Sequence, residues 1–78
     1  MSTKRALKER DLAALAKRFR QETGKTKAQA SLELGVNSST MHLAEEDPEQ
    51  SLTKLRCRII ERYSRYKVVG PVYVLEKK

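Results

Sequence analysis

Residue types that carry enzymatic chemistry are few in this chain of 78 residues. His42 is the only histidine, and it has no cysteine at zinc-ligand spacing, since Cys57 is the only cysteine. The sequence also lacks a nucleophile–base pair, a Gly-rich phosphate loop and paired carboxylates in an apolar setting. It therefore predicts that the protein is not an enzyme and that it has neither a metal site nor a cofactor.

The lone cysteine also bears on the compartment. Cys57 excludes a disulfide framework and suits a reducing environment, and on an amphipathic stretch it is interpreted as core filler. Residues 1–11 lack the apolar run of a signal peptide, and no segment approaches the roughly 20 apolar residues of a membrane span. We therefore expect a soluble, cytoplasmic, single-domain protein with no membrane partner.

Basic side chains are the most abundant binding chemistry in the sequence, which has a formal net charge of +7. Residues 1–27 hold nine Lys or Arg against three Asp or Glu, and residues 54–78 hold eight against two. Residues 28–53 hold none against five, so the middle of the chain is acidic. The basic flanks favour an anionic partner, although Lys and Arg also serve simply to keep a surface soluble.

Four helices are expected to position these side chains, because apolar residues recur at helical spacing and capping residues separate the runs. The first helix is predicted over residues 4–22. The expected caps and stops are Thr3 and Gly24 for the first helix, Thr26 and Gly35 for the second, Asn37 and Pro48 for the third, and Ser51 for the fourth.

Beyond Tyr66 the pattern changes from helical to extended. Residues 68–75 are rich in β-branched and aromatic side chains and predict a strand, with Gly70-Pro71 at an edge or a bulge. No second strand is indicated elsewhere, and unpaired backbone groups are costly when buried. The expected mate is therefore the same strand of a second subunit, antiparallel across a two-fold axis. The residues expected at this dimer interface are Val68, Val72, Tyr73, Val74 and Leu75, with Tyr63 and Tyr66 packing at the same seam.

Residues 27–46 have the form of two short helices separated by a Gly-containing turn, which is a helix-turn-helix. Where such helices cross, the earlier one needs a small side chain, which Ser31 supplies. The turn needs a residue with φ > 0, which Gly35 supplies. The apolar residues expected to join the two helices are Ala30, Leu34, Val36, Met41 and Ala44.

This stretch resembles the phage repressor/Cro-like (XRE) helix-turn-helix family, through the run TKAQASLELGVNSSTM (residues 26–41) and its continuation to Glu45. The resemblance extends over about residues 12–62. It implies a mainly α, four-helix lambda-repressor-like domain (residues 1–66), to which residues 67–78 add a C-terminal β-strand and tail as a dimerisation arm. It also implies an ion pair between Arg20 and Glu45. The function it implies is regulation of transcription by a homodimer bound to double-stranded DNA.

The residues that would touch DNA follow from this resemblance. The second helix of the motif enters the major groove with its N-terminal end first. The side chains implied to contact base edges are Ser38, Ser39, His42 and Leu43. Those implied to contact phosphate are Lys17, Lys25, Lys27 and Asn37, with Arg18 and with Arg56 or Arg58 adding affinity. The acidic stretch from Glu45 to Asp47, with Glu49, would lie at the far end of this helix and point away from DNA.

The sequence departs from the family pattern at several positions. Lys27 stands where a Gln is usual, Lys25 where an apolar residue is usual, and Leu43 where a polar residue is usual. Ser31 and Ala44 are smaller or more polar than the common residues, which thins the core. The second helix of the motif has no Arg, Gln or Lys for a bidentate base contact. An alternative therefore stays open: a protein-interaction module or antitoxin-like protein that kept the fold with little recognition of base sequence.

Overall fold

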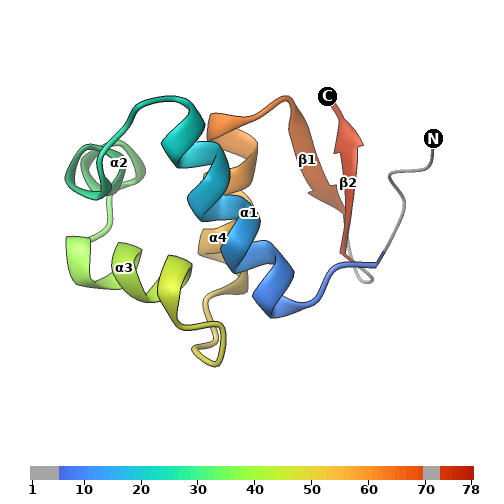
Figure 1. Cartoon of the computed structure of the whole chain (residues 1–78), viewed down its shortest axis with the longest axis horizontal. Coiled ribbons are helices and arrows are strands. Elements are labelled where there is room, and N and C mark those ends of the chain that lie inside the picture. Colours follow the sequence, from blue (N-terminus) through green and yellow to red (C-terminus); the bar gives the residue numbers. More distant parts are fainter. Residues whose placement is uncertain (1–5, 70–72) are drawn as a thin grey trace.

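The computed structural model describes residues 6–69 and 73–78. This part of the chain forms four helices and two strands, which are α1 (Glu9–Glu22), α2 (Lys27–Leu34), α3 (Ser38–Glu46), α4 (Thr53–Tyr63), β1 (Tyr66–Val69) and β2 (Val74–Lys77). In Figure 1, α1 lies across α4 in the middle of the molecule, α2 and α3 form one end, and the two strands form the other. The longest extent is 34 Å. The prediction of a mainly α fold is confirmed.

The first helix is shorter than predicted. It begins at Glu9 rather than five residues earlier, and the Lys8 N–H donates to Asp11 Oδ2 (2.9 Å) in its first turn. Thr3, the predicted cap, lies outside the described residues. Gly24, the predicted stop, follows the end of the helix and has φ +76°, a backbone conformation that favours glycine.

The predicted ends of α2 and the start of α3 are confirmed by local hydrogen bonds. Thr26 Oγ1 accepts from the Gln29 N–H (3.1 Å), and Gln29 Oε1 accepts from the Thr26 N–H (2.9 Å), which is a reciprocal capping box. Asn37 Oδ1 accepts from the Thr40 N–H (2.8 Å) and caps α3. Gly35 ends α2 with φ +73°, so a side chain at this position would be strained.

The predicted cap of α4 is wrong. Ser51 is exposed, and the residue before the helix is Leu52. Instead, the hydroxyl of Thr53 donates to the carboxylate of Glu9, which ties the start of α4 to the start of α1. A contact between helices therefore takes the place of the local cap that the sequence suggested.

The core lies where the four helices meet, and each helix contributes residues to it. Apolar residues recur on the inward face of each helix, because positions three and four apart lie on the same side. The wholly buried members of this cluster are Leu12, Ala16, Ala30, Met41, Ala44, Ile59 and Ile60. Within residues 6–69 and 73–78, no helix combines the length and apolar character needed to cross a bilayer.

The C-terminal segment forms a hairpin rather than one unpaired strand. β1 and β2 pair antiparallel, with a register that runs from Tyr66 opposite Lys77 to Val69 opposite Val74. The prediction of a single strand without a mate in its own chain is therefore wrong. It failed because Tyr66–Val69 and Val74–Lys77 are two strands that pair with each other. The predicted interface residue Val72 lies outside the described residues.

The hairpin packs on its own core. The Phe19 and Tyr66 rings lie with centroids 6.0 Å apart, and the Leu7 N–H donates to the Tyr73 carbonyl (2.7 Å). Tyr63 is buried in the helical core. Most of the side chains expected at a dimer seam thus contact the core of their own chain, and the described strand residues are paired with each other. The half-buried hairpin residues packed against the core are Tyr66, Val68, Tyr73 and Leu75, and Val74 is also half-buried.

Candidate functional site

The turn between α2 and α3 sets the direction of α3. Ser31 is buried where the two helices approach, and its Oγ donates to the Ala28 carbonyl (2.8 Å). The Val36 N–H donates to the Ser31 carbonyl (3.0 Å), which closes the turn after Gly35. Small and apolar side chains thus let the two helices pack closely. The joining residues behave as the sequence predicted: Ala30, Met41 and Ala44 are wholly buried, Leu34 is buried and Val36 is half-buried.

A buried ion pair ties α3 to α1. Arg20 Nε donates to Glu45 Oε2 (2.5 Å) and Arg20 Nη2 to Glu45 Oε1 (2.9 Å), a bidentate geometry in which the side chains are only 7% and 0% exposed. Arg20 Nη1 also donates to the Lys25 carbonyl (2.6 Å). The hydrogen bond to Glu45 raises the pKa of Arg20. The orientation of α3 is therefore held from both ends.

Within the described part of the chain, no helix or strand covers the outer face of α3. Asn37 Oδ1, besides capping the helix, accepts from the Ser39 hydroxyl (2.8 Å). Leu43 is 37% exposed. The residues on the opposite, inward face are Met41, Ala44 and Glu45. The structure leaves all the expected base-contacting side chains exposed, namely Ser38, Ser39, His42 and Leu43.

Two of the lysines expected to contact phosphate meet at one carboxylate. Lys17 Nζ lies 2.7 Å from Glu46 Oε2, and Lys27 Nζ lies 3.4 Å from the same oxygen. The Lys27 ammonium also donates to His42 Nδ1 (3.0 Å). Glu46, part of the stretch expected to point away from DNA, instead reaches back to these lysines. This lysine–Glu46 cluster was not foreseen from the sequence.

Lys25, the third lysine expected to contact phosphate, also forms an ion pair. Lys25 Nζ lies 2.8 Å from Glu33 Oε2, while Glu33 Oε1 accepts from the Tyr63 hydroxyl (2.6 Å). The Lys25 bond, followed by the Tyr63 bond, lowers the pKa of Glu33 to about 2. Burial and the same Glu33 bond raise the pKa of Tyr63. Glu33, near the end of α2, thus connects the segment between α1 and α2 with the end of α4.

Arg56 has a structural role, and its burial leaves Arg58 as the candidate phosphate contact of the two. Its side chain is wholly buried and bonds to the carboxylate of Glu9. It also donates to three carbonyls at the end of α3 and in the loop that follows, those of Ala44 (2.8 Å), Asp47 (2.7 Å) and Gln50 (2.9 Å). Arg58 is exposed, but its Nη2 donates to the Leu34 carbonyl (2.7 Å) at the end of α2. Arg18 pairs with Glu22 (3.0 Å) on the surface of α1.

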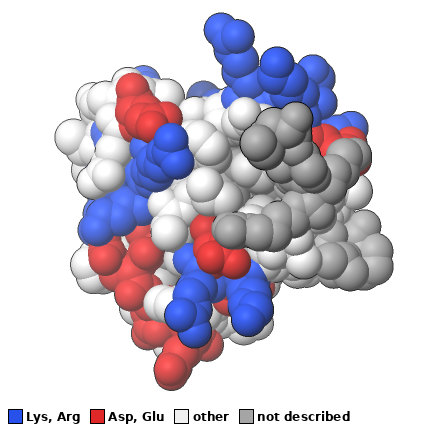
Figure 2. Space-filling view, turned by 45° about the vertical axis from the view of Figure 1, so that its right-hand side comes forward, with Lys and Arg blue, Asp and Glu red and all other residues white. Residues whose placement is uncertain are grey.

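The charges on the visible surface are mixed. Figure 2, in which the hairpin end comes forward, shows a group of basic side chains at the top and acidic side chains toward the lower left, with the two interspersed between. This face is therefore not a continuous basic surface. Any anion that binds this face meets carboxylates next to the cations.

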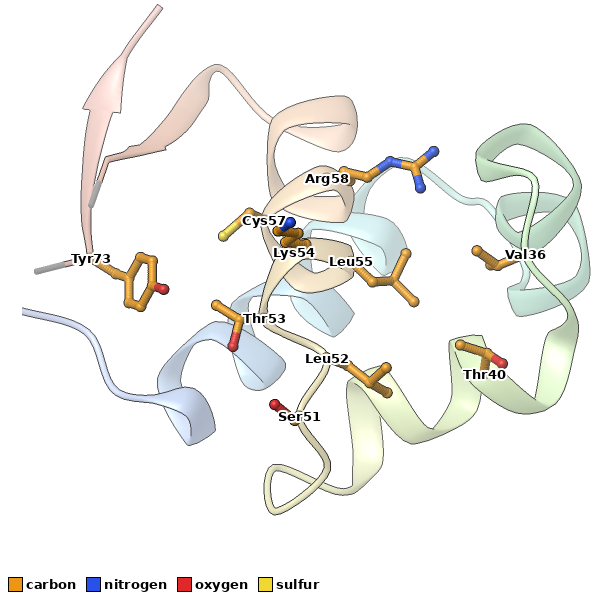
Figure 3. A pocket seen from close by; sticks show the side chains of 10 residues that line it. All are labelled: Val36, Thr40, Ser51, Leu52, Thr53, Lys54, Leu55, Cys57, Arg58 and Tyr73. Carbon is orange, nitrogen blue, oxygen red and sulfur yellow. The ribbon is translucent and has the colours of Figure 1, made fainter. Parts of the chain in front are cut away.

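An open groove of about 920 Å³ runs along α4. In Figure 3, Leu52 and Leu55 point toward Val36 and Thr40, and Tyr73 lies on the other side of α4. The wall is mainly apolar. The remaining lining residues are Ser51, Thr53, Lys54, Cys57 and Arg58. Cys57 is half-buried here, not in the centre of the core, and burial raises the pKa of its thiol.

No family model, curated protein or solved structure matches the chain. The functional interpretation consequently depends on the geometry of the described residues. Sequence reasoning located the outer face of α3 and the Arg20–Glu45 pair. It missed Glu33, Glu46 and the buried Arg56, because their partners lie on other helices and leave no local pattern.

Proposed function

We propose that the protein is a helix-turn-helix DNA-binding regulator of the phage repressor/Cro-like class, acting in the cytoplasm as a homodimer. The observation that carries this proposal is the setting of α3. Its N-terminus is capped by Asn37, its C-terminal half is held by the buried Arg20–Glu45 pair, and its outer face is uncovered. A rigid helix with a free polar face is what insertion into a major groove requires.

On this proposal, α3 enters the major groove with its N-terminal turn leading. Ser39 and His42 offer hydrogen bonds to base edges, and Leu43 offers an apolar contact to a thymine methyl group. The side chains are short or lack a bidentate fork, so discrimination per base is near the low end of roughly 1–3 kcal/mol. Lys17, Lys25 and Lys27 contact phosphate, which contributes affinity without reading sequence.

A homodimer remains part of the proposal for a reason that does not involve the tail. A single α3 can contact few base pairs, and two copies that bind half-sites about one helical turn apart add their contacts. With β1 and β2 paired to each other, the dimer must use another surface. Sedimentation equilibrium with and without duplex tests this part directly.

Selection from a random duplex pool tests the function as a whole. We expect enrichment of a two-fold symmetric site, together with affinity that falls steeply as salt rises. Ser39→Glu places a carboxylate on the outer face of α3 and should abolish binding while the helical circular dichroism is retained. Glu49→Gln is a control outside this face. Recovery of no preferred sequence, with equal binding by both variants, would contradict the proposal.

A second candidate function is protein docking, which the groove along α4 favours. Its apolar wall includes Leu52 and Leu55, and Lys54 and Arg58 supply positive charge among the lining residues. This combination fits an acidic amphipathic helix of a partner. A designed Glu/Leu peptide should then bind and shift the amide resonances of the groove, and Lys54→Glu should weaken it. A Lys/Leu peptide is the matched control, and equal binding of both peptides would exclude this docking mode.

A further inference from the structure

The lysine–Glu46 cluster brings three helices to one point. Lys17 comes from α1, Lys27 is the first residue of α2, and Glu46 is the last residue of α3. A single oxygen, Oε2 of Glu46, lies 2.7 Å and 3.4 Å from the two ammonium nitrogens. An oxygen at that point therefore contacts both cations at once. A phosphate oxygen has the charge and the acceptor geometry to take the same place.

Without these two lysines, the position of Glu46 at the end of α3 is electrostatically unfavourable. A carboxylate at the C-terminal end of a helix opposes the helix dipole, whereas an anion near the start of α2 is favoured by it. The bond to Lys17, supported by Lys27, lowers the pKa of Glu46 and keeps it ionised. Two cations from other helices thus stabilise the carboxylate of Glu46, whereas the dipole of its own helix opposes it.

The cluster is accessible to a ligand. The side chains of Lys17, Lys27 and Glu46 are 39%, 30% and 34% exposed. Ion pairs at this exposure are weak and exchange readily, because water screens them. His42, which accepts from Lys27 at 3.0 Å, adjoins the cluster from the outer face of α3. The cluster therefore lies directly beside the face proposed to enter the groove.

We propose that Lys17 and Lys27 form one phosphate site and that Glu46 occupies it as an internal competitor that a DNA phosphate must displace. This inference rests on the proposed DNA-binding function and identifies a residue that limits it. Non-specific affinity comes almost entirely from phosphate neutralisation. An internal carboxylate at this site weakens binding to every duplex alike, so binding depends more on the contacts that α3 makes to bases.

The test compares two variants that remove one negative charge each. Glu46→Gln is isosteric and removes the negative charge that competes for the site. Glu49→Gln removes one negative charge from the exposed loop after α3 and serves as the control. We expect Glu46→Gln to bind a random-sequence duplex about 5- to 10-fold more tightly than the wild type and to steepen the salt dependence by about one unit. Glu49→Gln should change affinity less than 2-fold. Fluorescence anisotropy over a salt series measures both quantities.

Three outcomes would overturn the inference: unchanged affinity of Glu46→Gln, weaker binding of Glu46→Gln, or the same gain in both variants. Thermal unfolding checks that each variant is folded. A titration with inorganic phosphate, followed at the His42 ring resonances, separates this site from the wider function. A response in Glu46→Gln but not in the wild type, without DNA binding by either, supports the phosphate site and rejects the DNA-binding function. No response and no DNA binding reject both.

Discussion

The two ends of the molecule are stabilised in different ways. At the α2–α3 end, charged side chains join the helices, as in the Arg20–Glu45 pair and the lysine–Glu46 cluster. At the hairpin end, apolar packing and backbone pairing predominate, as in the contact of Tyr66 with Phe19 and the pairing of β1 with β2. Charged contacts are directional, whereas apolar contacts depend mainly on buried area.

This difference explains what each end leaves on the surface. The ion pairs orient α3 while using only its inner face and its C-terminal end, so the outer face stays uncovered. The hairpin packs half-buried apolar side chains against its own core, among them Tyr66, Val68, Tyr73 and Leu75. Substitutions at the α2–α3 end should therefore affect both binding and stability, and substitutions at the hairpin should affect stability alone.

The largest expected effect is the loss of the buried ion pair. Arg20→Ala leaves the wholly buried carboxylate of Glu45 without its guanidinium, which should cost about 3 kcal/mol in the free energy of unfolding. Arg18→Ala, which removes the exposed pair with Glu22 and the contact of the guanidinium with the Phe19 ring (6.0 Å), should cost no more than about 1 kcal/mol. Urea denaturation measures both. A double-mutant cycle with Glu45→Ala that shows no coupling would remove this pair from the account.

The next largest effect is expected at the hairpin, where a substitution should change stability but not DNA binding. Tyr66→Ala removes the ring that packs against Phe19 and should cost about 2 kcal/mol, less than a fully buried aromatic residue because Tyr66 is half-buried. DNA affinity measured well below the melting temperature should not change. Lys67→Ala, on the exposed side of β1, is the control. If Tyr66→Ala kept its stability but lost self-association, the tail would be a dimerisation arm after all.

A third prediction concerns the stability of the fold at acidic pH. The pKa of Glu33 is about 2 in the folded chain and near 4.5 otherwise, so its ionised form favours folding. This stabilisation is complete above pH 4.5 and is lost as the pH falls from 4.5 toward 2. Glu33→Gln should therefore flatten the decline of stability in that window, whereas Glu49→Gln should not. Thermal unfolding at several pH values tests this prediction. The same pH dependence of stability in the wild type and both variants would contradict the role given to Glu33.

The smallest effect on stability belongs to the outer face of α3. Leu43→Gln should change the free energy of unfolding by less than about 0.5 kcal/mol, because the side chain is 37% exposed. On the proposed function, it should alter the preferred DNA sequence. Leu32→Gln, at an 83% exposed position on α2, should change neither. A large loss of stability in Leu43→Gln would show that Leu43 is part of the core.

Much of the helical framework was predictable from the sequence, because its determinants are local. Thr26 and Asn37 bond to backbone groups three residues away, and Gly35 adopts a positive φ that other residues avoid. Apolar spacing identified the inward faces of the helices. The residues on the exposed face of α3 were implied by the family resemblance, and the buried Met41 and Ala44 lie on the opposite face.

The failures arose where tertiary contacts competed with local preference. Ser51 is a good capping residue, yet α4 starts at a bond between Thr53 and Glu9 on another helix. The valine-rich tail suggested one strand, but pairing within the chain satisfies its backbone groups without a second subunit.

The sequence by itself determined the two ends of α2, the start of α3 and the inward faces of the helices, since these depend on interactions within about one helical turn. Apart from the Arg20–Glu45 pair, which the family resemblance implied, only the tertiary structure decided which charges meet. Glu46 lies 19 positions from Lys27, and Arg56 lies 47 positions from Glu9. Side chains this far apart in the chain meet only after α1, α3 and α4 have packed. That packing makes Arg56 a buried structural residue and places Glu46 between two lysines.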